Sequence, residues 1–416
     1  MGSQPPPDLC FVPASELLRL YKTRKASPLE VMQAVLARID AVNPALNAYV
    51  TLARESALAG ARKATAALKR KTALPPLHGI PVSIKDLTPT KGIRTTWGSK
   101  IFADHVPEED AITVERLKQA GAIVVGKTNT PEFGAGGNTF NAVFGPTRNP
   151  WNPALTCGGS SGGAAVALAT GMGPLAQGSD TGGSLRMPAA FCGVVGFRTS
   201  PGLVPHHPRA LAWDTISVTG PMARTVTDTA LMLSVLAGPD DRAPLSYAGR
   251  HARAHAGGEG AVGQGLAHRV DAGPRRPHPR RRRDRARRGR GDPRLSLARR
   301  TPRGRLPRLQ RGQRHRAGHA RRRDGRQPRP ASPRWKNEMQ KGLVWNIEQG
   351  LALTPEAIGR AETLRGLLWQ RVRAFMETRD LLILPTTSVP PVSRRAAVPD
   401  RDQRQARSTT TSSGRS

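Results

Sequence analysis

The spacing of apolar residues along the chain predicts a domain in which helices and strands alternate. Apolar residues three and four positions apart indicate amphipathic helices, and short apolar runs rich in β-branched residues indicate buried strands. Helices are predicted at residues 15–21, 27–39, 55–71, 110–120, 164–170, 187–193, 225–236 and 355–377. Strands are predicted at residues 77–87, 122–125, 194–197 and 381–384. Up to about residue 248, this alternation is typical of a layered α/β domain.

One predicted helix carries its own start signal. Ser27 is the expected N-cap, Pro28 follows at the first helical position, and Glu30 stands where it can complete a capping box. The helix is therefore expected to begin at this serine.

The apolar pattern is lost in two Arg-rich segments. Residues 249–334 contain 28 Arg, no Lys and five acidic residues, and residues 393–416 contain six Arg and two acidic residues. The formal net charge of the whole chain is +35, of which these segments carry +23 and +4, so the other 306 residues carry only +8. Residues 249–334 also lack Ile, Phe, Tyr, Met and Asn. Such a segment cannot bury enough apolar surface to offset its chain entropy.

We therefore divide the chain into a core at 1–248, an Arg-rich low-complexity segment at 249–334, a continuation of the domain at 335–392 and a tail at 393–416. The low-complexity segment and the tail are expected to be disordered. We hypothesise that both are wrong-frame translations of a GC-rich gene, which would yield this mixture of Arg, Ala, Gly and Pro. A genuine Arg tract that binds RNA or DNA is the alternative, and nucleic acid is the less favoured partner.

The remaining composition excludes several classes of protein. Cys10, Cys157 and Cys192 form no C-x-x-C pair, so neither a disulfide framework nor a zinc site is indicated. Cys192 is expected to be a small buried hydrophobe, whereas Cys157 borders a glycine-rich loop and is an alternative nucleophile. No signal peptide and no apolar run of membrane-spanning length is visible. The cytoplasm is the expected location, without membrane contact.

The candidate chemistry is concentrated in residues 158–186, where two glycine-flanked serines stand at the ends of an alanine-rich helical run. Glycine lets the backbone adopt positive φ and approach a substrate closely. Thr181, Gly182, Gly183 and Ser184 offer consecutive N–H groups with little side-chain bulk, which is what an oxyanion hole requires. A serine at the end of such a run can attack a carbonyl group whose oxygen is held.

Three other interpretations of this stretch are weaker. A flexible linker would not contain the apolar helix at 164–170. A phosphate-binding nest lacks the lysine that usually accompanies it. Residues 158–162 match the G-x-S-x-G nucleophile elbow, but no convincing strand precedes them, and His206 and His207 lie in a proline-bounded loop.

A lysine stands at the end of the predicted strand 77–87. Val82, Ile84 and Leu87 surround Lys85 in sequence, which indicates a desolvated setting. Desolvation lowers a lysine pKa from about 10.4 towards neutrality, and a neutral amine can act as a base. A second lysine belongs to residues 121–128, which match the spacing of a P-loop; there the intervening residues form a strand instead of a loop, so the match is discounted.

Taken together, Lys85, Ser160 and Ser184 with their neighbouring residues closely resemble the amidase signature family. The resemblance covers residues 10–248 and, more weakly, 335–392. It implies an α/β fold with a mixed β-sheet core covered by helices on both faces, here with an incomplete carboxy-terminal part. It assigns the catalytic lysine to Lys85, a serine in a cis peptide to Ser160, and the nucleophile to Ser184.

The resemblance also implies an amidase that hydrolyses a carboxylic acid amide to the acid plus ammonia or an amine, without cofactor or metal. Thr181, Gly182 and Gly183 would form the oxyanion hole together with the Ser184 amide, while Ser161, Asp180 and Arg186 match positions that support the loop. The expected partner is a small-molecule amide substrate, and a homodimer is compatible with the sequence. The alternative is a glutaminase-type A subunit of a tRNA-dependent amidotransferase, which would use the same three residues. An inactive product is a further alternative, because Arg-rich residues replace sequence that supplies part of the substrate pocket in the family.

Overall fold

The computed structural model describes residues 8–70, 73–248, 336–379 and 381–393. The hypotheses made above for the Arg-rich residues 249–334 and for the tail at 393–416 concern parts of the chain outside these described residues, except for Ser393, which forms an isolated β-bridge with Leu155.

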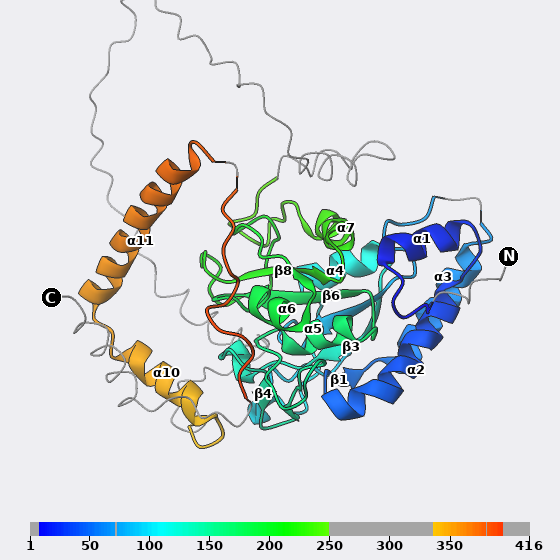
Figure 1. Ribbon diagram of the computed structural model, residues 1–416, viewed down its shortest axis with the longest axis horizontal. Coiled ribbons are helices and arrows are strands. Elements are labelled where there is room, and N and C mark those ends of the chain that lie inside the picture. The colour runs from blue at the N-terminus through cyan, green and yellow to red at the C-terminus, as the bar shows by residue number, and fades with distance from the viewer. Residues whose placement is uncertain (1–7, 71–72, 249–335, 380, 394–416) are drawn as a thin grey trace, which may run out of the picture.

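A six-stranded mixed sheet forms the centre of the described domain (Figure 1). Its strand order is β1-β3-β2-β6-β8-β7, with β2 parallel to both β3 and β6 and the other neighbouring pairs antiparallel. The strands are β1 (Tyr49–Leu52), β2 (Pro81–Lys85), β3 (Ile123–Thr128), β6 (Leu175–Asp180), β7 (Val195–Gly196) and β8 (Val218–Ala223). Every residue of β2 is buried, as expected of a central strand with neighbours on both sides.

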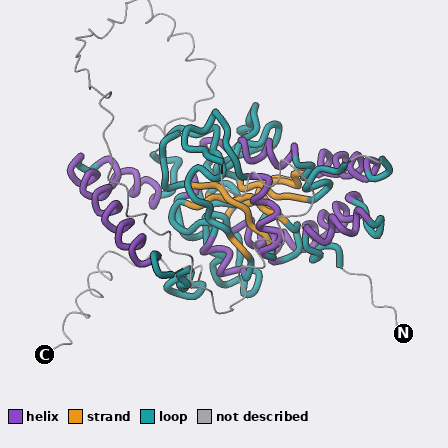
Figure 2. The backbone as a smooth tube through the Cα atoms, turned by 90° about the horizontal axis from the view of Figure 1, so that it is seen from above, coloured by secondary structure: helices purple, strands orange, loops and turns teal. Residues whose placement is uncertain are grey.

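Helices lie on both sides of this sheet (Figure 2), so the predicted α/β architecture is confirmed. They are α1 (Ala14–Lys22), α2 (Pro28–Leu46), α3 (Arg54–Ala67), α4 (Ile112–Gln119), α5 (Gly162–Ala169), α6 (Arg186–Cys192) and α7 (Val226–Leu236). The capping box at the start of α2 is present: Glu30 N donates to Ser27 Oγ, and Ser27 N donates to Glu30 Oε2. The smaller elements are β4 (Phe140–Asn141), β5 (Gly145–Pro146) and two 3-10 turns, Lys100–Phe102 and Glu132–Gly134.

The sheet places the candidate catalytic residues at one edge. Parallel strands end at the same edge of a sheet, so the carboxyl ends of β2 and β6 lie close together. Ile84 of β2 pairs with Gln177 of β6. Lys85, the last residue of β2, therefore lies beside the end of β6, from which the glycine-rich loop at 181–184 departs.

The first helix is capped by a residue from the other end of the domain. Asp228 of α7 accepts the N–H groups of Ala14 and Ser15 at 2.8 and 2.9 Å, and its side chain is buried. These N–H groups belong to the first turn of α1, which has no partner within its own helix. The tertiary contact between α1 and α7 thus supplies the cap that the local sequence lacks.

Two helices follow the Arg-rich segment and stand apart from the sheet (Figure 1). They are α10 (Lys341–Leu351) and α11 (Pro355–Met376), and none of their residues is buried. The helix predicted at 355–377 is therefore confirmed, but the strand predicted at 381–384 is wrong: these residues form no strand, and Ile383 is 90 % exposed. No helix of the described chain is long and apolar enough to cross a membrane.

Candidate active site

Lys85 lies at the centre of a buried cluster of hydroxyl groups. Its side chain is fully buried at the end of β2. Its Nζ atom lies 2.6 Å from Ser160 Oγ, 2.9 Å from Ser161 Oγ and 3.0 Å from Ser179 Oγ. The structure thus brings the predicted lysine and the first predicted serine into direct hydrogen-bond contact.

The hydrogen-bond pattern around Lys85 fits both the charged and the neutral amine, and burial favours the neutral one. Ser161 Oγ donates its proton to the carbonyl oxygen of Ser179 at 3.2 Å, so it can only accept from the lysine. As an ammonium, Lys85 Nζ can donate to all three oxygens; as a neutral amine, with two N–H groups and one lone pair, it can donate to two of them and accept from the third. Burial lowers the pKa of Lys85 to about 7, although the charge of Asp180 acts in the opposite direction.

Ser160 is held in a loop whose backbone is closely surrounded. The Gly159–Ser160 peptide bond is cis, as the family resemblance predicted, and the serine is almost fully buried. A side chain on Gly134 would meet Leu87 and would approach Ser160 Oγ to 3.5 Å.

The described residues directly before Gly158 form no strand, so the nucleophile-elbow interpretation lacks the element that it requires.

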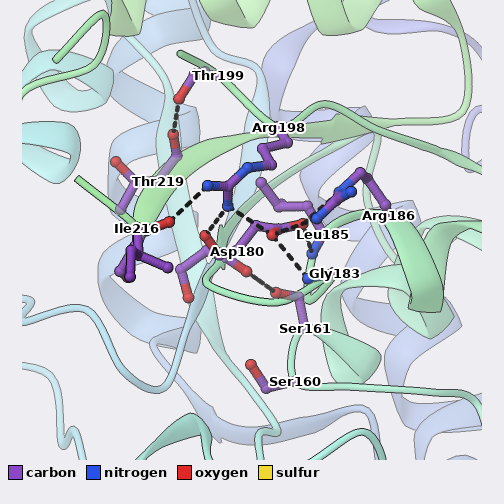
Figure 3. A network of polar contacts seen from close by, with 12 residues as sticks. Ser160, Ser161, Asp180, Gly183, Leu185, Arg186, Arg198, Thr199, Ile216 and Thr219 are labelled. Atoms are coloured by element: carbon purple, nitrogen blue, oxygen red, sulfur yellow. Dashed lines mark hydrogen bonds and ion pairs between the residues drawn. The ribbon is translucent and has the colours of Figure 1, made fainter. Parts of the chain in front are cut away.

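The loop after β6 is organised by a single carboxylate (Figure 3). Asp180 is fully buried and accepts the N–H groups of Gly183 and Leu185 at 2.9 and 3.1 Å. Arg186 adds a bidentate contact, with both distances 3.0 Å. Burial alone would raise the pKa of Asp180, but these hydrogen bonds and the charge of Arg186 hold it well below its usual range. The carboxylate is therefore ionised and fixes both ends of the turn.

The turn leaves N–H groups free for a ligand. Among the described residues, the N–H groups of Thr181, Gly182 and Ser184 have no acceptor, whereas that of Gly183 is engaged by Asp180. Thr181 and Gly182 are exposed. Gly183 has φ +119°, and no atom lies within 4 Å of the position that a Cβ would take.

The predicted nucleophile is joined to the buried cluster through the backbone. Ser161 N donates to the carbonyl oxygen of Ser184 at 3.1 Å, which places the two glycine-flanked serine segments side by side. The Ser184 hydroxyl makes no hydrogen bond within the described part of the chain, and its side chain is only partly buried. Ser184 is thus close to the Lys85 cluster in the fold, without a direct hydrogen bond to Ser160.

A second buried lysine has a different set of partners. Lys127 Nζ contacts the carbonyl oxygen of Thr88 and lies 2.9 Å from the hydroxyl oxygens of both Thr90 and Thr95. Those hydroxyls donate to the carbonyl oxygens of Thr88 and Ile93, so all three partners accept from the lysine. Such a set favours the charged ammonium, even though burial lowers the pKa of Lys127 to about 7 against the opposing charges of Asp86 and Asp110. Because Lys127 lies within β3, the P-loop interpretation of residues 121–128 is wrong.

The other candidates from the sequence do not join this cluster. All three cysteines are buried, and burial raises the pKa of the Cys192 thiol well above its usual value. No group of three or more His, Cys, Asp or Glu side chains in the described ranges is placed to hold a metal ion.

Sequence reasoning missed two residues at this site. Ser179 is a partner of Lys85, and Arg198 is a partner of Asp180 at 2.8 Å. Ser179 directly precedes Asp180 in the glycine-rich stretch, so its place in sequence could have drawn attention to it. Arg198 directly follows the predicted strand 194–197, but nothing in the sequence near it indicates a contact with Asp180.

Comparison with known proteins places this geometry in a family. The Amidase family model matches residues 30–255. The chain is 44 % identical over 239 residues to an acylamidase from Rhodococcus erythropolis, covering 58 % of this chain and 50 % of that protein. It is also 46 % identical over 235 residues to the A subunit of the glutamyl-tRNA(Gln) amidotransferase from Carboxydothermus hydrogenoformans, covering 56 % of this chain and 48 % of that protein. The chain therefore spans about half the length of the curated relatives it matches.

Solved structures give the same result. The crystal structure of a bacterial aryl acylamidase of the amidase signature family superposes with a TM-score of 0.56 and 35 % identity, covering 57 % of this chain and 50 % of that one. A peptide amidase from Stenotrophomonas maltophilia superposes with a TM-score of 0.52 and 34 % identity, covering 56 % and 50 %. From the matched family model, the relatives and the mixed sheet that carries the glycine–serine loops, we conclude that the chain belongs to the amidase signature family.

Proposed function

We propose that this chain is an amidase that hydrolyses a carboxylic acid amide through Ser184, Ser160 and Lys85. Ser184 Oγ attacks the amide carbonyl carbon while Ser160 takes its proton and Lys85 takes the proton of Ser160. The carbonyl oxygen becomes an oxyanion, held by the N–H groups of Thr181, Gly182 and Gly183. The Gly183 N–H would be shared with Asp180.

The relay then runs in reverse. The C–N bond breaks, and the leaving nitrogen receives a proton from Lys85 through Ser160, releasing ammonia or an amine. Water attacks the acyl-serine in the same way and releases the acid. An amide needs this arrangement because it combines a weakly electrophilic carbonyl group with a poor leaving group.

The observation that carries the proposal is the 2.6 Å contact between Lys85 Nζ and Ser160 Oγ within a fully buried environment. A buried lysine with a lowered pKa is the basic partner that a Ser-Lys mechanism requires. The test is whether the isolated full chain hydrolyses simple aryl and alkyl amides. Turnover is measured as the release of ammonia or amine. Wild-type turnover that Ser184→Ala loses would support the proposal; turnover retained by Ser184→Ala would overturn it.

A second candidate is a glutaminase-type A subunit of a tRNA-dependent amidotransferase. The observation in its favour is the 43–46 % identity to several amidotransferase A subunits, a range that includes the 44 % identity to the acylamidase. Such a protein would release ammonia from glutamine for a partner protein. Glutamine turnover that requires added partner proteins, with no turnover of simple amides, would favour this candidate.

A further inference from the structure

We propose that Arg198 is a positioning residue for the oxyanion hole, because it fixes the orientation of the Asp180–Thr181 peptide. This inference rests on the proposed function, in which the loop at 181–184 binds the oxyanion. Arg198 follows β7, and its side chain reaches the end of β6 (Figure 3). The Arg198 side chain is 25 % exposed, whereas the Asp180 side chain that it contacts is fully buried.

Arg198 makes three contacts that converge at the start of the loop. Its Nη1 donates to Asp180 Oδ1 at 2.8 Å and also to the backbone carbonyl oxygen of Asp180. Its Nη2 donates to the carbonyl oxygen of Ile216, two residues before β8, at 2.6 Å. The planar guanidinium therefore ties the end of β6 to the entry of β8 in one fixed geometry.

Peptide geometry turns these contacts into an orientation for the Thr181 N–H. A trans peptide is planar, so the N–H of a residue points opposite to the carbonyl group that precedes it. Because Arg198 binds the carbonyl oxygen of Asp180, the N–H of Thr181 must point away from Arg198. That N–H has no acceptor among the described residues, and Thr181 is exposed. It is left for the oxygen of a substrate carbonyl.

Arg186 cannot replace this function. It binds the same carboxylate of Asp180, but through both carboxylate oxygens and from within the loop's own helix, α6. No contact joins Arg186 to the backbone carbonyl of Asp180 in the described chain. The two arginines therefore divide their roles: Arg186 holds the carboxylate, and Arg198 also holds the peptide group.

The test compares Arg198→Met with a matched control at the next residue. Thr199 Oγ1 donates to the carbonyl oxygen of Thr219 at 3.0 Å, so it links the segment after β7 to β8 without touching Asp180 (Figure 3). Thr199→Val removes that link and keeps the side-chain shape. Arg198→Lys is the conservative variant, which keeps a positive charge but loses the planar fork.

The probe is an alkyl fluorophosphonate, added to the full chain. Ser184 Oγ forms a bond to phosphorus, fluoride leaves, and the hydroxyl proton passes to the Ser160–Lys85 pair, while the phosphoryl oxygen occupies the oxyanion hole. Intact-mass spectrometry measures the labelling rate. We expect Arg198→Met to label about 10- to 100-fold more slowly than wild type, a smaller loss than the about 10²–10³-fold typical of removing one oxyanion donor, because the Thr181 N–H is displaced but still present. Arg198→Lys should be intermediate and Thr199→Val unchanged.

Deuterium exchange of residues 181–187, measured without the fluorophosphonate, provides a readout that does not depend on the reaction of Ser184. We expect faster exchange in Arg198→Met than in wild type or Thr199→Val, because the turn loses one of its anchors. Labelling and exchange that are both unchanged in Arg198→Met would overturn the role of Arg198. A wild-type chain that never reacts, but whose exchange still depends on Arg198, would count against the proposed function alone.

Discussion

The amine of Lys85 and the hydroxyl of Ser160 meet at 2.6 Å although 75 positions of sequence separate them. The lysine comes from the end of a buried parallel strand and the serine from a glycine loop before α5. Each group needs the other, since a buried amine must find hydrogen-bond partners and a serine hydroxyl needs a base to take its proton. Their contact gives the buried amine a partner and, under the proposed mechanism, would give a proton its route.

The first prediction concerns the nucleophile. Ser184→Ala should lower kcat for an amide substrate by at least about 10⁴-fold, because the attacking oxygen is lost. The hydroxyl makes no hydrogen bond within the described residues, so the free energy of unfolding should hardly change. The control is Ser234→Ala, which removes a hydroxyl that donates to the Leu231 carbonyl oxygen in α7. It should retain wild-type kcat; equal activity in the two variants would contradict the assignment.

The second prediction is an acidic limb in the pH profile. The pKa of Lys85 is lowered to about 7, and the relay needs the neutral amine. Below this pH, kcat/KM should therefore fall about tenfold per pH unit, and above it the value should level off. A profile that stays flat between about pH 5 and 8 would show that this amine is not the base.

The same lysine predicts a pH-dependent stability. Its pKa is about 7 in the folded protein and near 10.5 when exposed. Between these values the unfolded chain binds a proton that the folded chain does not, so the free energy of unfolding should rise with pH across this window. Lys85→Met should remove this contribution and give a flatter dependence. Denaturant titrations at several pH values, run on both proteins, would measure the difference.

The fourth prediction separates the effect of backbone strain on stability from the effect of the loop on catalysis. Gly183 has φ +119° and Gly92 has φ +73°, and neither has an atom within 4 Å of the position of a Cβ. Alanine at either position should therefore cost about 1–3 kcal/mol in free energy of unfolding through backbone strain. Only Gly183→Ala should also lower kcat, by about 10²–10³-fold, because it displaces oxyanion donors. Equal kcat in both variants would argue that the loop at 181–184 does not bind the oxyanion.

The fifth prediction addresses the alternative nucleophile. Cys157 is fully buried, with its Sγ 3.5 Å from the carbonyl oxygens of Thr147 and Gly158. Cys157→Ala should lose about 1 kcal/mol of stability and retain turnover. Turnover is measured by amine release and stability by thermal unfolding. Loss of turnover from a variant that remains folded would reopen the cysteine as a catalytic group.

The elements that the sequence predicted well are those with a local physical cause. The helix that begins after Ser27 has its cap, its proline and its capping box in consecutive positions, and the structure starts it at Pro28. The strand that ends at Lys85 was visible because its neighbours are apolar. In both cases the signal lies within a few residues of the feature that it predicts.

The elements that were missed depend on distant partners. β6 contains Gln177, Ser179 and Asp180, so it lacks an apolar run and is a strand because β2 and β8 pair with it. The apolar run at 381–384 is the opposite case: its sequence is typical of a strand, but no strand of the described chain pairs with it. Arg198 was invisible for the same reason, since its partners Asp180 and Ile216 each lie 18 positions away.

The contact of Asp228 with α1 has a consequence for how this protein folds during its synthesis. It caps α1 from 214 positions further along the chain. A ribosome delivers the amino terminus first, so the initial helix must wait for almost the entire core to be synthesised before its exposed amides acquire their partner. Contacts of such long range slow folding, so α1 stays without its cap until synthesis has passed α7.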